Sequence, residues 1–143
     1  MQQEISDLYH RAAAVVDLAC ISHNLQIVRH KAPGKKIIAM IKANAYGHGL
    51  VRVAAHLVSE GVDYLGTAFV EEALELRKAG ITIPIITSGP FSKFQIGLFI
   101  ENNIDCTISS VEALQYISEA ADFYQKKVNI HLKVDTGMMR IGI

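Results

Sequence analysis

The chain has 143 residues, half of them hydrophobic, and its 14 basic side chains equal its 14 acidic ones. This composition argues against a disordered chain, and the balanced charge argues against a nucleic-acid partner, which would need a clustered basic excess. No apolar run approaches the ~20 residues that cross a bilayer, so we expect no membrane partner. The length suits a single domain with its own core.

The start of the chain and its cysteines indicate a cytoplasmic protein. The segment from Met1 to His10 is polar and acidic and lacks the basic start and apolar stretch of a signal peptide. Cys20 and Cys106 lie far apart without metal-ligand spacing, and a secreted disulfide scaffold would carry more cysteines. We therefore expect both cysteines to be buried apolar fillers in a reducing compartment, and we expect no metal site.

The first recognisable pattern is a helix followed by a strand. Apolar residues at three- and four-residue steps predict a helix with one buried stripe, formed by Leu18, Ile21, Leu25 and Val28. The helix should end near Ala32, because Pro33-Gly34 is a stop signal. The next apolar run, 36–41, predicts a strand that is covered on both faces, as in parallel sheets.

The rest of the chain repeats this alternation in units of roughly twenty residues. Further helices are predicted over 50–61, 71–80, 92–102 and 110–124. Further strands are predicted over 62–69, 83–87, 105–108 and 128–134. Gly80 is a plausible C-cap of its helix, and Ser109 or Ser110 is the expected N-cap of the last one.

Alternating strands and helices predict a right-handed parallel α/β architecture. No Gly-x-Gly-x-x-Gly joins the first strand to its helix, which argues against a Rossmann fold. A (β/α)8 barrel fits better, although such a barrel takes about 250 residues. We therefore expect a partial TIM-type barrel with about five βα units. Its open edges, near Ile38 and Leu132, would lead it to self-associate or to be one piece of a longer molecule.

Chemistry in such barrels gathers at the carboxyl ends of the strands, and the first candidate there is the octapeptide Lys42–Gly49, KANAYGHG. An ammonium directly after five apolar residues should be partly desolvated. Desolvation favours the neutral, nucleophilic amine, which forms a Schiff base with an aldehyde cofactor. Gly47 and Gly49 allow a ligand to approach the backbone, and Tyr46 offers a hydroxyl. On position alone, the commoner alternative is a solvated lysine that ends a strand and is followed by ordinary turn residues.

The second candidate lies at the end of the last predicted strand, in the segment His131–Gly142. A guanidinium just past a strand end, such as that of Arg140, suits a substrate carboxylate or a phenolic oxygen. The alternative is that Arg140 pairs with Asp135 and only closes the loop. Lys133 stands within an apolar strand, where a buried ammonium needs a partner.

The octapeptide resembles the cofactor-lysine motif of the alanine racemases, which are fold-type III pyridoxal-phosphate enzymes. The similarity covers about residues 13–143 and includes 15–25, 70–73, 76–77, 80–81, 84–85 and 131–142. The resemblance implies that the chain acts on alanine, interconverting its L and D forms with pyridoxal 5′-phosphate as cofactor. It also implies a cytoplasmic homodimer that supplies D-alanine for the bacterial cell wall.

The resemblance also assigns roles to single residues. Lys42 would hold the cofactor as a Schiff base and act as one of two acid/base groups, and Tyr46 would hydrogen-bond the cofactor phosphate. Arg140 would contact the cofactor's phenolic oxygen and the substrate carboxylate. Lys133 matches a lysine that is often carbamylated in the family and then orients the arginine. Met139 falls where many members have glycine or a small or polar residue.

One half of the racemase site has no counterpart in this sequence. In the family, the second acid/base group is a tyrosine from the C-terminal β-domain of the partner subunit. The resemblance therefore implies that residues 1–143 are the N-terminal part of the barrel domain, without the later strands or the β-domain, and are inactive alone. Three alternatives stay open: a related racemase acting on serine, a non-catalytic pyridoxal-phosphate-binding barrel, and an interaction fragment without a small-molecule role.

Overall fold

The computed structural model describes residues 14–143, so the predictions made for Met1–His10 lie outside the described residues. Five parallel strands form one sheet in the order β1-β2-β3-β4-β5. The strands are β1 (Ile38–Met40), β2 (Tyr64–Thr67), β3 (Ile85–Thr87), β4 (Asp105–Ile108) and β5 (Ile130–Leu132). The predicted parallel α/β architecture with five strand units is confirmed, and β1 and β5 are the edges, as expected.

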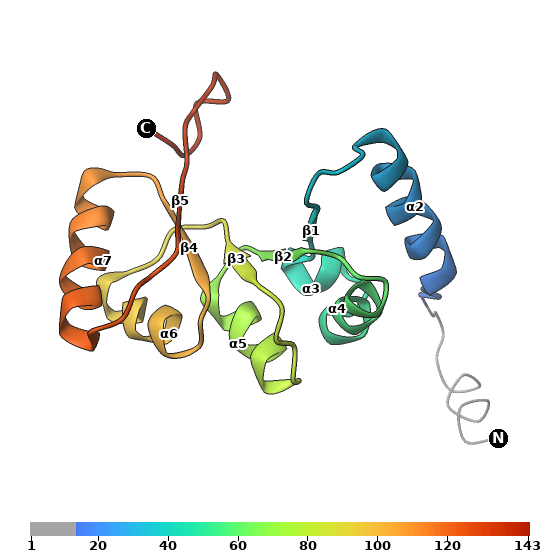
Figure 1. The fold of residues 1–143 in the computed structure, drawn as a ribbon, viewed down its shortest axis with the longest axis horizontal. Helices are drawn as coiled ribbons and strands as arrows, with labels where there is room; N and C mark the ends of the chain where they lie inside the picture. Colours follow the sequence, from blue (N-terminus) through green and yellow to red (C-terminus); the bar gives the residue numbers. More distant parts are fainter. Residues whose placement is uncertain (1–13) are drawn as a thin grey trace.

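Helices connect the strands and cover one face of the sheet. They are α2 (Leu18–Lys31), α3 (Lys42–Tyr46), α4 (Leu50–Ser59), α5 (Val70–Lys78), η1 (Lys93–Gln95), α6 (Ile96–Glu101) and α7 (Val111–Tyr124), where η1 is a 3₁₀ turn. Figure 1 shows α4, α5, α6 and α7 in a row along the sheet. In the same view, α2 stands beyond β1, and the C-terminal segment extends past β5.

Local side-chain hydrogen bonds set the ends of the two longest helices. The Asp17 carboxylate accepts the Ala19 N–H at 2.8 Å and caps α2. The Ser110 hydroxyl accepts the Ala113 N–H at 3.1 Å and caps α7, as one of the two predicted serines was expected to do. Each cap satisfies an N–H that the first helical turn leaves without a partner.

The core lies between the sheet and its helices. Leu65, Ile85, Cys106 and Ile108 point to this side of the sheet and are fully buried. Helix α4 contributes Leu50, Val53, Ala54 and Leu57 to this core.

The opposite face of the sheet is partly open, which corrects one prediction. The parallel register places Ile38 and Met40 on the same face as Tyr64 and Gly66. Ile38 is 44% exposed and Met40 39% exposed, so the run 36–41 is not covered on both faces. Among the described residues, no helix packs over this side, and the sheet is closed on its helical side alone.

A polar cluster on the open face shows that the sheet is curved. Asp105 is buried and accepts hydrogen bonds from Asn129 Nδ2 at 3.3 Å and His131 Nε2 at 3.2 Å. The ring of His131 meets that of Tyr64 edge-on, with centroids 6.3 Å apart. Tyr64 and His131 lie on β2 and β5, which a flat sheet would separate by about 14 Å. The curvature brings them together, as in the wall of a barrel.

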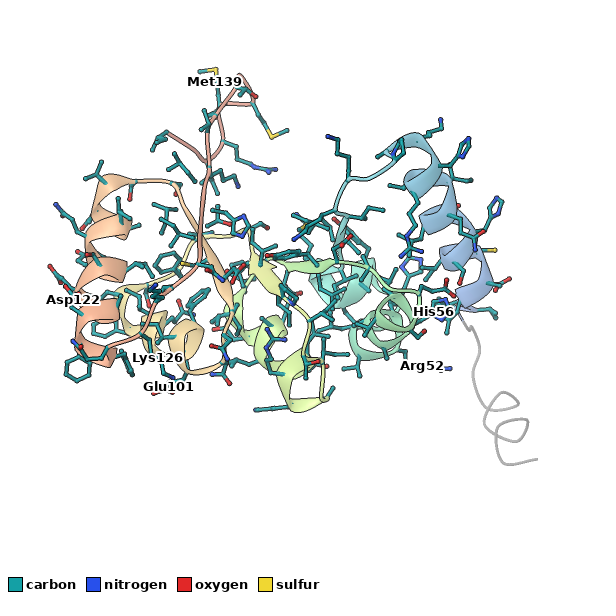
Figure 2. The ribbon with its side chains drawn as sticks, viewed as in Figure 1. Arg52, His56, Glu101, Asp122, Lys126 and Met139 are labelled. Carbon is teal, nitrogen blue, oxygen red and sulfur yellow. The ribbon has the colours of Figure 1, made fainter. Side chains whose placement is uncertain are left out.

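Helix α2 departs from the prediction at two positions. Val28 is exposed, so the predicted stripe is buried fully at Leu25 alone. The reason is that α2 packs against α4 rather than on the sheet. Ser22 lies 2.7 Å from Nε2 of His56, which Figure 2 labels, and donates to Oε1 of Glu60, the C-cap of α4, at 2.9 Å. Cys20 lies on the exposed side of α2, so its predicted burial is wrong.

The two cysteine thiols therefore sit in different surroundings. The Cys20 thiol donates to Asp17 Oδ2 at 3.5 Å, and this hydrogen bond raises its pKa. Cys106 is buried as predicted, and burial raises the pKa of its thiol to about 11. Neither is a reactive thiolate at neutral pH.

None of the helices described here is long and apolar enough to span a bilayer.

Candidate functional site

Lys42 follows β1 at the carboxyl edge of the sheet, where the sequence placed it. The Ile41 N–H donates to the Gly66 carbonyl at 2.8 Å, which extends the pairing with β2 right up to Lys42. Ile41 is buried and Lys42 is half-buried. The lysine therefore leaves the sheet from an ordered backbone position.

The backbone after Lys42 forms a left-handed turn. Ala43, Asn44, Ala45 and Tyr46 have φ angles of 53°, 55°, 53° and 53°, and Gly47 follows at 86°. The left-handed region costs an L-residue about 1–2 kcal/mol, so four such residues in succession need strong support. Part of it is internal: Ala45 N–H donates to Ile41 O at 2.8 Å, and Gly47 N–H donates to Ala43 O at 3.1 Å.

Two side chains supply further support for the turn. The side-chain oxygen of Asn44 accepts the Leu50 N–H at 2.7 Å and thereby ties the turn to the first residue of α4. The Glu72 carboxylate of α5 accepts the Ala43 N–H at 2.5 Å through Oε1. Its other oxygen accepts the Ala68 N–H at 2.8 Å. From the sequence, Glu72 was merely an acid at the start of a helix, and no local pattern pointed to its contact with the Lys42 turn.

Tyr46, Gly47 and Gly49 lie on the accessible side of this turn. Tyr46 is 59% exposed, so its hydroxyl is free to meet a ligand. A Cβ built on Gly47 (φ 86°) or Gly49 (φ 95°) would meet no atom within 4 Å. Backbone conformation, not crowding, therefore calls for glycine at both positions, and space is open beside them. A cavity of about 270 Å³ adjoins the loop and is lined in part by Asn44, Gly47 and Gly49.

His48 behaves as a turn residue. Its Nδ1 lies 2.8 Å from the Ala45 carbonyl and 3.2 Å from the Tyr46 carbonyl, so Nδ1–H donates within its own loop. This is the local role expected for a histidine in such a turn.

The second candidate segment leaves the sheet at β5. Lys133 is half-buried, and its ammonium donates to the Ser88 carbonyl at 3.3 Å, just past the end of β3. The partner that the sequence required for this lysine is thus a backbone carbonyl at the carboxyl edge of the sheet.

Asp135 organises the loop that carries Arg140. Its carboxylate accepts the backbone N–H groups of Gly137 (2.8 Å), Met139 (3.1 Å) and Arg140 (2.9 Å). These bonds, that of Gly137 first, hold the pKa of the Asp135 carboxyl below its usual value. In residues 14–143 the ion pairs are His56–Glu60 and His131–Asp105, so the Arg140 guanidinium does not pair with Asp135. Asp135 closes the loop through the backbone instead.

The structure places the predicted site residues at one edge of the sheet but does not bring them into contact. Lys42 and Tyr46 follow β1, whereas Lys133 and Arg140 belong to β5 and the segment after it, at the other end of the strand order. Figure 2 shows Met139 near the tip of this segment, away from the helices. Arg140 is exposed.

The groups at this edge fit a phosphorylated aldehyde cofactor in their chemistry. Lys42 offers a primary amine, which an aldehyde requires for covalent attachment. Tyr46 offers an accessible hydroxyl, and Arg140 offers a guanidinium suited to anionic oxygens. The open space at Gly47 and Gly49 leaves room for a ligand beside the backbone.

A different cavity, of about 200 Å³, lies at the amino ends of the strands. Its lining includes Tyr64, Asp105 and Asn129. Arg77 borders it and donates to the carbonyls of Ile81 and Ile83, both at 2.8 Å, and of Asn102 at 3.0 Å. In barrels this end of the sheet serves stability, and Arg77 ties three segments together there.

Comparisons with known proteins show the family of this chain. A family model described as "Alanine racemase, N-terminal domain" matches residues 16–143. Alanine racemase 1 of Oceanobacillus iheyensis is 38% identical over 136 residues, which are 94% of this chain and 36% of that protein. The chain thus spans about a third of the length of the curated relatives it matches.

Solved structures give the same picture. An alanine racemase of Clostridium difficile matches with a TM-score of 0.81 and 42% identity, over 84% of this chain and 32% of that one. A histidine racemase of Leuconostoc mesenteroides matches with a TM-score of 0.82 and 33% identity, over 87% of this chain and 34% of that one. The predicted fold class, a part of a barrel, is confirmed by these likenesses.

Proposed function

Because the chain belongs to the alanine racemase family, through its N-terminal domain, we propose that it is part of a pyridoxal-phosphate-dependent racemase that interconverts L- and D-alanine. The observation that carries the proposal is the half-buried Lys42, set at the carboxyl edge of the sheet by a braced left-handed turn. Such bracing fits a lysine whose amine must be held in one place.

The bound cofactor would supply an electron sink that acidifies the Cα–H of the substrate. Lys42 would hold the cofactor through its amine and, once released, would move a proton at the substrate Cα. Tyr46 would donate its hydroxyl to a phosphate oxygen. Arg140 would bind the cofactor's phenolic oxygen and the substrate carboxylate, and Lys133, as a carbamate, would orient Arg140.

The proposal extends to the rest of the molecule. Racemisation needs proton transfer on both faces of Cα, and Lys42 serves one of them. We place the second group on the C-terminal β-domain of a partner subunit in a homodimer, and the later barrel strands on further polypeptide. The 143 residues alone would then be inactive. The enzyme would be cytoplasmic and would supply D-alanine to the cell wall.

A second candidate differs in substrate. The likeness to a histidine racemase, at 33% identity, supports a racemase that uses the same lysine on another amino acid. Serine is the nearest such substrate in size. A non-catalytic cofactor-binding barrel is supported less well, because the chain's relatives are named as racemases.

Covalent trapping tests the role of Lys42. The chain is incubated with pyridoxal 5′-phosphate and reduced with borohydride, which converts the amine–aldehyde linkage into a stable secondary amine. Peptide mass spectrometry should find the label on Lys42 well above the exposed Lys35 and Lys36. Lys42→Ala should abolish this label, and Lys36→Ala should leave it unchanged. Uniform labelling of exposed lysines would contradict the proposal.

Turnover tests whether the 143 residues are active alone. L-alanine, L-serine and L-histidine are each incubated with the cofactor-loaded chain, and the D-isomers are measured by chiral chromatography. We expect no appreciable product from the 143 residues alone. Robust racemisation of L-alanine by this chain would refute the proposed division of the site between subunits.

A further inference from the structure

We propose that Glu72 is a positioning residue for Lys42, acting through the left-handed turn that follows the lysine. The inference rests on the proposed function of Lys42. In residues 14–143, neither a hydrogen bond nor an ion pair joins the Glu72 and Lys42 side chains, and the effect of Glu72 passes through the backbone N–H of Ala43, the next residue in the chain.

The carboxylate of Glu72 joins two strand ends. Oε1 accepts the Ala43 N–H at 2.5 Å, just after β1. Oε2 accepts the N–H groups of Ala68 at 2.8 Å and Phe69 at 3.3 Å, just after β2. One side chain on α5 therefore fixes the segments that leave two neighbouring strands at the carboxyl edge of the sheet.

The bond to Ala43 meets a specific need of the turn. Ala43 is the first of the four residues with left-handed φ, and a helical turn leaves its first N–H groups without internal acceptors. The internal bonds of the turn begin with the N–H of Ala45 on Ile41 O. Glu72 thus supports the strained turn at the end that adjoins Lys42.

Capping of α5 alone does not explain this arrangement. A glutamate in the first turn of a helix commonly accepts the N–H that precedes the helix, and Oε2 does so at Phe69. Oε1 instead reaches Ala43, which lies 29 positions earlier in the sequence. The neighbouring Glu71 accepts the side-chain amide of Gln95 at 2.8 Å and makes no contact with the turn. Glu71 is therefore a matched control on the same helix.

The substitutions distinguish bridging from capping. Glu72→Gln keeps the size of the side chain but has one acceptor oxygen, and its amide N–H₂ cannot accept the second set of N–H groups. Glu72→Asp keeps both oxygens on a shorter side chain. Glu71→Gln changes the charge of α5 equally and leaves the bridge in place.

The experiment measures two quantities in each variant. Amide hydrogen exchange of Ala43, Ala68 and Phe69 reports on the bridge without cofactor. The rate of reductive labelling by pyridoxal 5′-phosphate at Lys42, relative to Lys36, reports on the lysine. Thermal unfolding of each variant checks that the fold is kept.

We expect Glu72→Gln to speed exchange at Ala43 and to slow relative labelling of Lys42, each by about tenfold, as for the loss of one charge-assisted hydrogen bond. Glu71→Gln should change neither. The inference is overturned if Glu72→Gln labels Lys42 at the wild-type rate, or if Glu71→Gln has the same effect as Glu72→Gln.

The two proposals fail separately. If wild-type Lys42 is not labelled, the proposed function fails, and with it the positioning role. If wild-type Lys42 is labelled but Glu72→Gln labels it at the wild-type rate, only the positioning role fails. Should Glu72→Gln unfold, Glu72→Asp decides by the same two measurements.

Discussion

The two segments that carry the candidate site are held in different ways. The turn after β1, residues 41–50, has internal hydrogen bonds and is also braced from outside: Gly66 accepts from Ile41, and Glu72 accepts from Ala43. The segment after β5, residues 133–143, is braced mainly from within. Asp135 binds three N–H groups of its own loop, and the Ile143 N–H donates to Lys133 O at 3.0 Å.

This difference means that a segment can keep its own backbone conformation without being fixed relative to the sheet. The turn after β1 is fixed in both respects, because helices and a neighbouring strand hold it. The second keeps its internal shape through Asp135, but Met139 is 91% exposed and the loop extends beyond the sheet (Figure 1). We infer that the described residues hold Lys42 more firmly than they hold Arg140.

The largest expected effect on the free energy of unfolding comes from removing an apolar side chain next to each segment. Leu50, at the start of α4, is 3% exposed, whereas Leu132, on β5, is 61% exposed. Leu50→Ala should lower the free energy of unfolding by about 2–5 kcal/mol, because it leaves a cavity in the core. Leu132→Ala should lower it by less than about 1 kcal/mol. Urea unfolding measures both, and equal losses would contradict the comparison.

The next effect concerns the side chain that ties the first turn to α4. Asn44→Ala removes the acceptor for the Leu50 N–H and places alanine at a φ of 55°. The free energy of unfolding should fall by about 1–2 kcal/mol. Asn44→Asp keeps an acceptor oxygen and should recover most of the loss. If Asp is no better than Ala in urea unfolding, the hydrogen bond is not the cause.

A smaller effect on stability is expected from relieving the left-handed backbone strain at one residue in each segment. Ala43 and Met139 are exposed residues with φ of 53° and 55°. Glycine relieves the left-handed strain but adds freedom to the unfolded chain, so each substitution should change stability by at most about 1 kcal/mol. Thermal unfolding of Ala43→Gly and Met139→Gly compares the two sites directly.

The smallest expected effect is local and depends on pH. The pKa of Asp135 is lowered from 3.8 by its backbone hydrogen bonds, so the carboxylate contributes fully above that value. Its contribution is lost as the pH falls below 3.8 through the lower folded pKa. The amide shifts of Gly137, Met139 and Arg140 should then titrate together in NMR spectra. The Leu50 amide, held by the neutral Asn44 side chain, should stay unchanged by this ionisation.

Much of the fold could be predicted from the sequence because apolar periodicity and caps are local signals. The strand Asp105–Ile108 and the Ser110 cap are observed as predicted. The strand over 128–134 is shorter in the structure, at Ile130–Leu132, because pairing with β4 covers only part of the apolar run. The exposure of Val28 depends on how α2 meets α4, which periodicity does not encode.

The sequence indicated the candidate residues of the site but not the backbone turn and the distant contacts that hold them. The octapeptide indicated Lys42, and the strand end indicated Arg140, from residue types at the carboxyl edge. The left-handed turn was not foreseeable, since alanine favours the right-handed helix and the turn depends on Gly66 and Glu72, far along the chain. The roles assigned to Lys42, Tyr46, Lys133 and Arg140 stay predictions until the trapping and turnover experiments are done.

The strand order has a consequence for biosynthesis. Each strand pairs with the one made just before it, from β1 to β5 without interruption. A ribosome releases about 5–20 residues per second, so each βα unit has on the order of a second to dock before the next appears. During translation, each new strand therefore pairs with the free edge of the strand made just before it, and then presents its own free edge to the next strand.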